Sequence, residues 1–327
     1  MEQQTFYDSD ADLKHIQSKS IGIIGYGNQG RAQALNLRDS GIVDISIGGI
    51  KDSSLERAVS DGFNTGTIEE VAANADILFL LIPDEVLPAI YQKSIAPHLK
   101  SQVILNFASG YNITFQKIIP SPQADVIMVA PRMIGEGVRD LYSKGAGYPC
   151  FVAVEQDCSG KGLTTALAIA KGIGATKIGA TQVTFKQETI MDLFAEQATW
   201  PLIEKVLVSA FEFQVAQGLP AAAVLSELYL SKEPAYMFEK MADIGFFKQM
   251  DLHSRTSQYG QLSRFEQVDA TFIQEFMSKA FKEINDGRFA EEWEQEQATG
   301  MNNFKKLKSQ ALAHEMNQVE DQVKGHR

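Results

Sequence analysis

Three carboxylates recur at four-residue intervals near the middle of the chain and together are candidates for binding a cation. Glu188, Asp192 and Glu196 would form a stripe on one face of a helix. Like charges at this spacing destabilise a helix unless water or a cation offsets their repulsion. Because the neighbouring residues are apolar, a partly buried stripe predicts a divalent cation with oxygen ligands, most readily Mg²⁺. A solvated acidic face is the alternative. Glu227, on a later predicted helix, is a further carboxylate for the same cluster.

A glycine-rich run is typical of a dinucleotide site. It follows the apolar residues Ile21–Gly25, precedes a predicted helix, and consists of Gly25, Tyr26, Gly27, Asn28, Gln29 and Gly30. In this pattern the first glycine permits a tight turn, the second lets the backbone approach a pyrophosphate, and the third lets helix and strand pack closely. The amides at the helix start favour phosphate charge. The pattern predicts a bound dinucleotide; a glycine-rich turn without a ligand is the alternative.

The loop after the second predicted strand indicates which nicotinamide cofactor is used. NAD enzymes usually carry an acidic residue at the end of that strand, and the segment Ile47–Ile50 has none. Lys51, Ser53 and Ser54 suit a 2′-phosphate by charge and hydrogen bonding, whereas Asp52 would repel it. The loop therefore favours NADPH. The alternative is that Ser53 or Ser54 is an ordinary helix N-cap.

Polar residues follow three other predicted strands, where ligands of open α/β sheets bind. Pro83 and Asp84 follow one strand, Ser109 the next, and Arg132 the third. Ser109 offers a hydroxyl near the nicotinamide, and the guanidinium of Arg132 suits a substrate carboxylate. Loop residues without a ligand are the alternative at each position.

The elements that must position these residues are of two kinds. Short apolar runs alternate with helical patterns as far as about Thr181, which predicts buried strands in a doubly wound parallel sheet. The strands are expected at Ile21–Gly25, Ile45–Ile47, Ile77–Ile82, Val103–Phe107, Val126–Val129 and Cys150–Val154. After Phe185 the apolar spacing is helical throughout. We therefore predict an α/β Rossmann domain over residues 1–183 and an all-α domain over residues 184–327.

Composition limits the function classes. The 327 residues suit two domains, and the net charge of −11 disfavours nucleic acid and anionic membranes as partners. Two cysteines, Cys150 and Cys158, give no disulfide framework, which indicates a reducing compartment. Residues Met1–Thr5 do not resemble a signal peptide, and no apolar run approaches the ~20 residues of a membrane span. We expect a cytoplasmic protein that acts on a small molecule.

The sequence resembles the ketol-acid reductoisomerase (acetohydroxy acid isomeroreductase) family along nearly its whole length. The similar segments are Tyr7–Leu13, Ile24–Leu37, Leu81–Glu85, Phe107–Ile113, Ala170–Gly174, Asp192–Gln197, Ser254–Gly260 and Gly287–Trp293. The resemblance implies an enzyme that uses NADPH and two Mg²⁺ ions to rearrange and reduce acetohydroxy acids in branched-chain amino-acid biosynthesis. The length resembles the short class, which has a knotted helical domain and forms dimers. In that class the partner chain completes each active site.

The resemblance also implies roles for several residues of the helical half. Asp192 and Glu196 match the family's first metal-binding pair, and Glu188 matches a nearby acidic residue. Glu227 matches one of two glutamates on the later helix, and Ser254 matches a substrate-facing serine. The helical domain is thereby expected to complete the active site and to form a homodimer or higher homo-oligomer.

Three positions depart from the family pattern. Ser109 stands at the active-site histidine, Arg132 at the active-site lysine, and Ala223 at the other glutamate. Arg132 cannot exchange a proton near neutral pH, and a missing carboxylate weakens a second magnesium site. Hydride transfer needs only the nicotinamide, a polarised C=O or C=N and a proton source. These changes favour a reductase of a keto acid or imine whose isomerase step is lost or altered.

In this hypothesis Arg132 holds the substrate carboxylate, while Asp192, Glu196 or Glu227 binds a cation or handles a proton. Two alternatives stay open. One is a functional ketol-acid reductoisomerase that tolerates the changes. The other is an NADPH-binding protein without turnover, against which the retained carboxylates argue.

Overall fold

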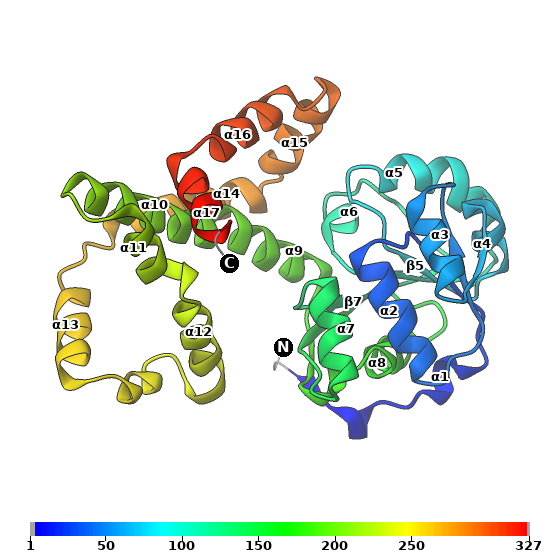
Figure 1. The fold of residues 1–327 in the computed structure, drawn as a ribbon. Helices are drawn as coiled ribbons and strands as arrows, with labels where there is room; N and C mark the ends of the chain where they lie inside the picture. The colour runs from blue at the N-terminus through cyan, green and yellow to red at the C-terminus, as the bar shows by residue number, and fades with distance from the viewer. Residues whose placement is uncertain (1–3, 326–327) are drawn as a thin grey trace. The chain divides into compact units, whose positions relative to one another are not determined.

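A computed structural model describes residues 4–325, and the chain divides into two compact units (Figure 1). The sheet unit is Met1–Met191 and the helical unit is Asp192–Arg327. The functional domain boundary between residues 183 and 184 stays a prediction.

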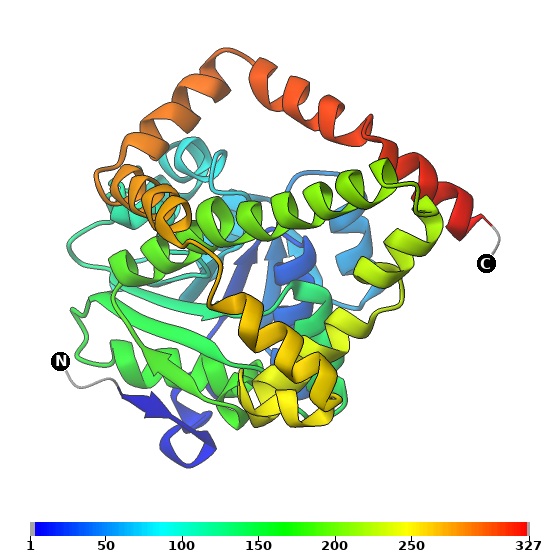
Figure 2. The ribbon, with the colours of Figure 1, turned by 90° about the vertical axis from the view of Figure 1, so that its left-hand side faces the viewer.

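The sheet unit is built on nine strands in the order β1-β9-β8-β7-β6-β5-β2-β3-β4. Figure 2 shows strands of this sheet, drawn as arrows, with helices against them. The bounds of the strands are β1 Thr5–Phe6, β2 Ile21–Ile24, β3 Ile45–Gly48, β4 Asn64–Gly66, β5 Ile77–Leu80, β6 Ile104–Phe107, β7 Asp125–Pro131, β8 Cys150–Gln156 and β9 Ala180–Gln182. All six predicted strands are present. The strands from β4 to β7 pair in parallel, and the chain reverses its direction of winding between β2 and β5. The doubly wound α/β fold is therefore confirmed.

The sheet is mixed rather than wholly parallel. β8 runs antiparallel to β7, with Pro131 opposite Cys150, and β1 runs antiparallel to β9. The expectation that Cys150–Val154 pairs in parallel is corrected by this register. The connection from β7 to β8 turns back at Gly145 and Gly147, both with positive φ, and so returns to the edge it left instead of crossing the sheet.

Helices cover both faces of the sheet, and alternate strand residues point into the two cores. On one face Ile23, Phe79 and Ile127 pack under α2 and α8, and on the other Ile24 and Leu80 pack under α4 and α5. The helical segments of this unit are η1 Asp8–Asp10, α1 Lys14–Gln17, α2 Asn28–Asp39, α3 Ser53–Ser60, α4 Ile68–Asn74, α5 Leu87–Ile90, η2 Tyr91–Ile95, η3 Ala96–His98, α6 Tyr111–Thr114, α7 Gly135–Ser143, α8 Gly162–Gly172 and η4 Ala175–Lys177. Because the helices pack on the two faces of the sheet, the carboxyl ends of the strands are followed by loops.

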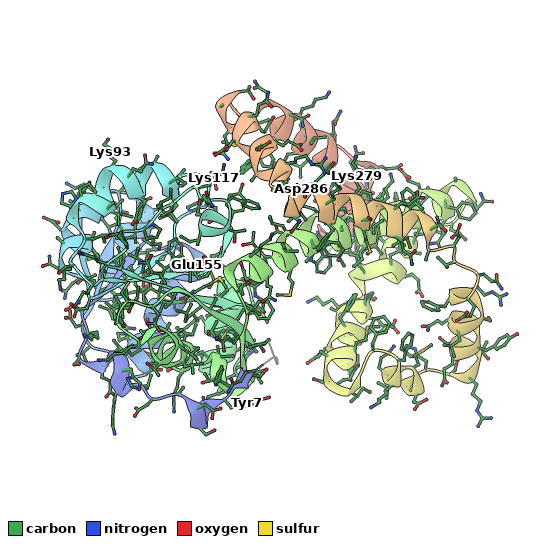
Figure 3. All side chains as sticks on the ribbon, turned by 180° about the vertical axis from the view of Figure 1, so that it is seen from behind. Tyr7, Lys93, Lys117, Glu155, Lys279 and Asp286 are labelled. Carbon is green, nitrogen blue, oxygen red and sulfur yellow. The ribbon has the colours of Figure 1, made fainter. Side chains whose placement is uncertain are left out.

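The chain after β9 is helical throughout its described length, as predicted. Helix α9, Phe185–Phe194, is followed by η5 Ala195–Thr199, α10 Trp200–Ala216, α11 Ala221–Leu225, η6 Ser226–Leu230, α12 Glu233–Ile244, η7 Lys248–Leu252, α13 Arg255–Phe265, α14 Thr271–Asn285, α15 Arg288–Ala298, α16 Asn302–Leu312 and α17 Glu315–Lys324. Figure 3 shows Lys279 on α14 and Asp286, which caps the end of that helix. A small core around Phe211, Val224 and Leu225 packs against α17.

Three segments of the described chain are π-helical, namely η2, η5 and η6. Such turns are rare and often mark functional sites. Among residues 4–325, no helix combines the length and apolar character needed to cross a membrane. The knot in the helical domain stays a prediction.

Candidate functional site

The glycine-rich turn lies at the carboxyl end of β2, at the point where the sheet changes its direction of winding. Gly25 has a φ of +98°, and a Cβ there would stand 2.6 Å from the carbonyl oxygen of Leu81. A Cβ on Gly30 would collide with the carbonyl oxygen of Gly25. In contrast, a Cβ on Gly27 would meet nothing within 4 Å. Gly25 and Gly30 therefore serve the fold, whereas Gly27 borders open space at the start of α2, where a pyrophosphate can approach.

Two side chains of this turn are used within the protein. Tyr26 is 2% exposed and its hydroxyl donates to Asp61 at 2.9 Å, so burial and this carboxylate raise its pKa. Arg31 donates to both carboxylate oxygens of Asp61, at 2.7 and 3.1 Å, and this pairing lowers the pKa of Asp61. Gln29 donates to the carbonyl of Met133 at 2.9 Å. The Tyr26 hydroxyl and the Gln29 amide N–H are thus both engaged by groups of the protein.

The loop proposed for the ribose end is organised by Asp52. Its carboxylate accepts hydrogen bonds from the N–H groups of Ser54 and Leu55, at 2.9 and 3.1 Å, and from the Ser54 hydroxyl at 2.6 Å. The Ser54 hydroxyl contributes most to lowering the pKa of Asp52. The N-cap of α3 is therefore Asp52, and the alternative that Ser53 or Ser54 is the cap is wrong. Lys51 and Ser53 are exposed beside this cap.

The loops after β5 and β6 are tied together. Asn112 of α6 donates to the backbone carbonyl of Asp84 at 3.2 Å and to its carboxylate at 2.9 Å. Ser109 is partly buried, and its hydroxyl oxygen accepts a hydrogen bond from the N–H of Tyr111 at 3.2 Å. Pro83 is exposed at the start of the first loop. Three predicted residues, Pro83, Asp84 and Ser109, thus stand at adjacent strand ends.

Glu188 joins the loops after β6 and β7. It is fully buried, accepts the N–H of Gly110 at 2.8 Å through Oε2, and accepts a guanidinium N–H of Arg132 at 2.9 Å through Oε1. The guanidinium carbon of Arg132 also lies 4.9 Å from the centre of the Phe151 ring. A permanent cation is therefore fixed at the carboxyl end of β7 by a carboxylate and an aromatic face.

The predicted carboxylate stripe does not form a single solvated face. Glu188 is enclosed within the sheet unit, whereas Asp192 is half-buried and Glu196 is exposed. The i, i+4, i+8 geometry fails beyond α9 because Glu196 lies in the π-helical segment η5, whose i→i+5 bonds rotate the following residues. The alternative of a solvated acidic face is therefore wrong for Glu188, whose carboxylate instead contacts Gly110 and Arg132.

In the helical unit, the other predicted residues lie on separate elements. Glu227 is exposed in the π segment η6, and Ser254 is the N-cap of α13, where its hydroxyl accepts the N–H of Ser257 at 3.2 Å. Both outer carboxylates of the predicted metal set, Glu196 and Glu227, thus lie in π turns. Across residues 4–325, no group of three or more histidine, cysteine, aspartate or glutamate side chains is arranged to hold a metal ion. The carboxylate oxygens of Asp192, Glu196 and Glu227 are of the kind that Mg²⁺ prefers.

Sequence reasoning missed the partners that fix these residues. The pairs Glu188–Arg132, Tyr26–Asp61 and Gln29–Met133 are 56, 35 and 104 residues apart in the chain. No local spacing signals such contacts. The one available signal was the buried helical setting of Glu188, since a buried carboxylate requires a partner.

A glycine-rich turn at the switch point of a doubly wound sheet, followed by a helical domain, defines an NAD(P)-binding oxidoreductase. Residues 15–179 match the family model "Acetohydroxy acid isomeroreductase, NADPH-binding domain", and residues 185–327 match "Ketol-acid reductoisomerase, C-terminal domain". The chain belongs to the ketol-acid reductoisomerase family, and it is an enzyme with the family's NADPH-binding domain.

Two relatives and one solved structure illustrate this membership. "Putative ketol-acid reductoisomerase 3" of Saccharolobus solfataricus is 42% identical over 319 residues, covering 96% of this chain and 95% of the relative. "Ketol-acid reductoisomerase (NADP(+))" of Methanocaldococcus jannaschii is 40% identical, covering 94% of each chain. The structure of an NADH-preferring ketol-acid reductoisomerase from an uncultured archaeon superposes with a TM-score of 0.93 at 35% identity, covering 98% of each chain.

Proposed function

We propose that this enzyme is an NADPH-dependent reductase of a 2-keto acid, or of the corresponding imine, whose isomerase step is lost or altered. The observation that carries the proposal is the ion pair of Arg132 with buried Glu188, 2.9 Å apart. An arginine stays protonated at neutral pH. Position 132, where the resemblance places a lysine, therefore binds an anion and does not exchange a proton.

The residues of this chain hold the reactants in the proposed reaction. When bound, NADPH supplies a hydride to the keto carbon, and with one proton the products are a hydroxy acid and NADP⁺. Arg132 binds the substrate carboxylate. The Ser109 oxygen accepts the Tyr111 N–H, and its own O–H stays available to donate to the substrate carbonyl oxygen. Lys51 and Ser53, exposed beside the Asp52 cap, bind the 2′-phosphate.

The proposal includes assembly of two copies. Large apolar residues of the helical unit remain exposed in one chain, among them Phe213, Tyr259 and Phe272. Such a surface is typical of an interface. Magnesium would then be held by Asp192 and Glu196 with a third carboxylate such as Glu227 from the second copy. No step of the proposed hydride transfer depends on that ion.

A functional ketol-acid reductoisomerase is the second candidate. One argument for it is that Asp192, Glu196, Glu227 and Ser254 match the family's residue types. The other is that two relatives named ketol-acid reductoisomerase are 42% and 40% identical to this chain over nearly its whole length. In this case the arginine at position 132 would be compatible with rearrangement as well as reduction.

The experiment that separates the candidates is NADPH oxidation by the purified protein. One arm contains 2-acetolactate with and without millimolar Mg²⁺, and the other contains a 3-hydroxy-2-keto acid that is already past the rearrangement. We expect turnover of the rearranged keto acid alone. The double variant S109H/R132K, which restores the family's residue types, tests whether these positions control acetolactate turnover.

Each outcome of the NADPH oxidation assay supports one candidate function or excludes it. Magnesium-dependent turnover of acetolactate by the unaltered enzyme would establish the second candidate and exclude the reductase proposal. If neither compound reacts although NADPH binds, the substrate lies outside the family's own, and cyclic imines and other 2-keto acids are the next substrates to test.

A further inference from the structure

We infer that Glu188 is a positioning residue that holds the two substrate-facing loops, after β6 and after β7, in one arrangement, and that it is not a cation ligand. The roles of Ser109 and Arg132 in this inference rest on the proposed function. The contacts of Glu188 themselves do not.

The first support is that the two oxygens of the Glu188 carboxylate contact two different loops. Oε2 accepts the N–H of Gly110 at 2.8 Å, and Oε1 accepts Nη2 of Arg132 at 2.9 Å. Gly110 directly follows Ser109 at the end of β6, and Arg132 directly follows β7. One side chain of α9 thereby fixes two predicted substrate contacts relative to each other.

The second support is burial. Glu188 is 0% exposed, so its charge is stable there only while charged or polar donors compensate for lost water. The Gly110 N–H and the Arg132 guanidinium are two such donors. Removing the carboxylate would in turn take away an anchor of the guanidinium, which also donates to the Ala130 carbonyl at 3.4 Å and lies 4.9 Å from the centre of the Phe151 ring.

The third support is the close packing around the carboxylate. A Cβ on Gly110 would stand 2.5 Å from the carbonyl oxygen of Phe185, 2.6 Å from the hydroxyl of Thr189 and 3.1 Å from Oε2 of Glu188. The β6 loop thus rests directly on the first turns of α9. A magnesium ion at this carboxylate would have to lie beside the guanidinium of Arg132, which would repel it. The geometry therefore favours Glu188 as a positioning residue and not as a metal ligand.

The test is a double-mutant cycle with E188Q, R132Q and E188Q/R132Q, with E204Q as the control for loss of a carboxylate at an exposed position of α10. For each variant we would measure the melting temperature, the NADPH dissociation constant, and kcat and KM for the keto acid that the unaltered enzyme reduces. The magnesium dependence of E188Q is measured in parallel.

We expect E188Q to lower kcat/KM by roughly 10- to 100-fold, the range for a lost charge-assisted hydrogen bond, while NADPH binding changes less than about twofold. In the R132Q background, E188Q should cause no further loss of kcat/KM and should raise the melting temperature. R132Q removes the cationic partner of the buried carboxylate, and the amide oxygen that E188Q introduces can still accept the Gly110 N–H. The inference would be overturned if the kcat/KM losses of the two single variants multiply in the double variant. It would also be overturned if E188Q leaves kcat/KM unchanged, or if higher magnesium restores the activity of E188Q. If E188Q fails to fold, E188D, which keeps the charge but shortens its reach, takes its place in the same cycle.

A second readout does not depend on turnover. Phenylglyoxal modifies accessible arginines, and peptide mass spectrometry reports the extent at Arg132. We expect slow labelling in the unaltered enzyme and E204Q, and faster labelling in E188Q. Equal labelling would overturn the inference even if the enzyme is active. If no keto acid or imine is turned over, the proposed function fails, while the labelling result still decides the role of Glu188.

Discussion

The three glycines of the glycine-rich turn, Gly25, Gly27 and Gly30, differ in what an added methyl group would contact. This difference distinguishes a glycine needed for cofactor binding from glycines needed for folding. At Gly27 a Cβ meets nothing within 4 Å, whereas at Gly30 it would collide with the Gly25 carbonyl. We predict that G27A leaves the stability of the cofactor-free protein within ~0.5 kcal/mol of the original but weakens NADPH binding roughly tenfold or more, because the methyl occupies the space of the pyrophosphate. Thermal melts and fluorescence titration with NADPH measure the two effects.

The matched control is G30A, which should destabilise the protein by about 1–3 kcal/mol or more through overpacking. If G27A binds NADPH as tightly as the unaltered protein, the open side of the turn does not receive the pyrophosphate. Equal melting temperatures for G27A and G30A would contradict the assignment of Gly30 to the fold.

Burial of Cys150 predicts a loss of stability at alkaline pH. The thiol is 1% exposed, and burial raises its pKa to about 12 from the ordinary 9.0. Below pH 9 both folded and unfolded thiols are protonated, so the contribution is complete; between about 9 and 12 only the unfolded thiol ionises, which favours unfolding by up to ~1.4 kcal/mol per pH unit. Urea unfolding of reduced protein and of C150A at pH 8, 9 and 10 measures this. The pH dependence should be weaker in C150A, and parallel curves would exclude the mechanism.

At the scale of elements, α2 connects the cofactor turn with the substrate loop after β7. Gln29, near the start of α2, donates to the Met133 carbonyl next to Arg132, and Gln33 donates to Gln29 at 3.1 Å. We predict that Q29M raises the KM for the keto acid several-fold while leaving NADPH affinity nearly unchanged, since only the side chain is lost and the helix-start amide remains. Steady-state kinetics and NADPH titration provide the measurement.

The control for Q29M is N28A, at the neighbouring exposed position. A Q29M protein with weakened NADPH binding and an unchanged KM would show that the Gln29 side chain belongs to the cofactor site itself.

The elements that the sequence predicted are those whose apolar pattern reflects their burial. β5 is buried at all four residues, and the other central strands are similarly enclosed, so short runs of Ile, Leu, Val and Phe identified them. β1, β4 and β9 were missed because they are two or three residues long and lie at or near the sheet edges, where pairing rather than apolar pattern stabilises them. The antiparallel direction of β8 is not encoded by apolar periodicity, which is the same for a buried strand of either direction.

The site was predictable to the extent that it follows from strand ends. Ser109 and Arg132 were correctly expected at the ends of two adjacent strands. Glu188, which accepts hydrogen bonds from Arg132 and from Gly110 beside Ser109, was instead assigned to a helical charge stripe. The i, i+4 spacing describes a helix in isolation and ignores the loops packed on it. The π segment that displaces Glu196 from the stripe has no local sequence signature in this chain.

At the scale of the whole molecule, the helical unit carries apolar surface that one chain does not cover. Phe246, Phe247 and Phe265 form edge-to-face contacts, with ring centres 5.0 and 6.2 Å apart, yet each is more than half exposed. Clustered exposed aromatic rings are typical of the energetic centre of an interface.

We therefore predict that the protein elutes as a dimer of twice 36.0 kDa, and that F265E, which places a charge in the phenylalanine cluster, dissociates it and abolishes turnover while NADPH binding persists. Light scattering after size exclusion gives the mass, and NADPH titration reports on the sheet unit. Q267E introduces the same charge two residues away at an exposed loop position and should leave the dimer intact. A monomeric unaltered protein would contradict the dimer, whereas a dimeric F265E would place the interface elsewhere on the helical unit. An active monomeric F265E would show that one chain supplies every residue the reduction needs.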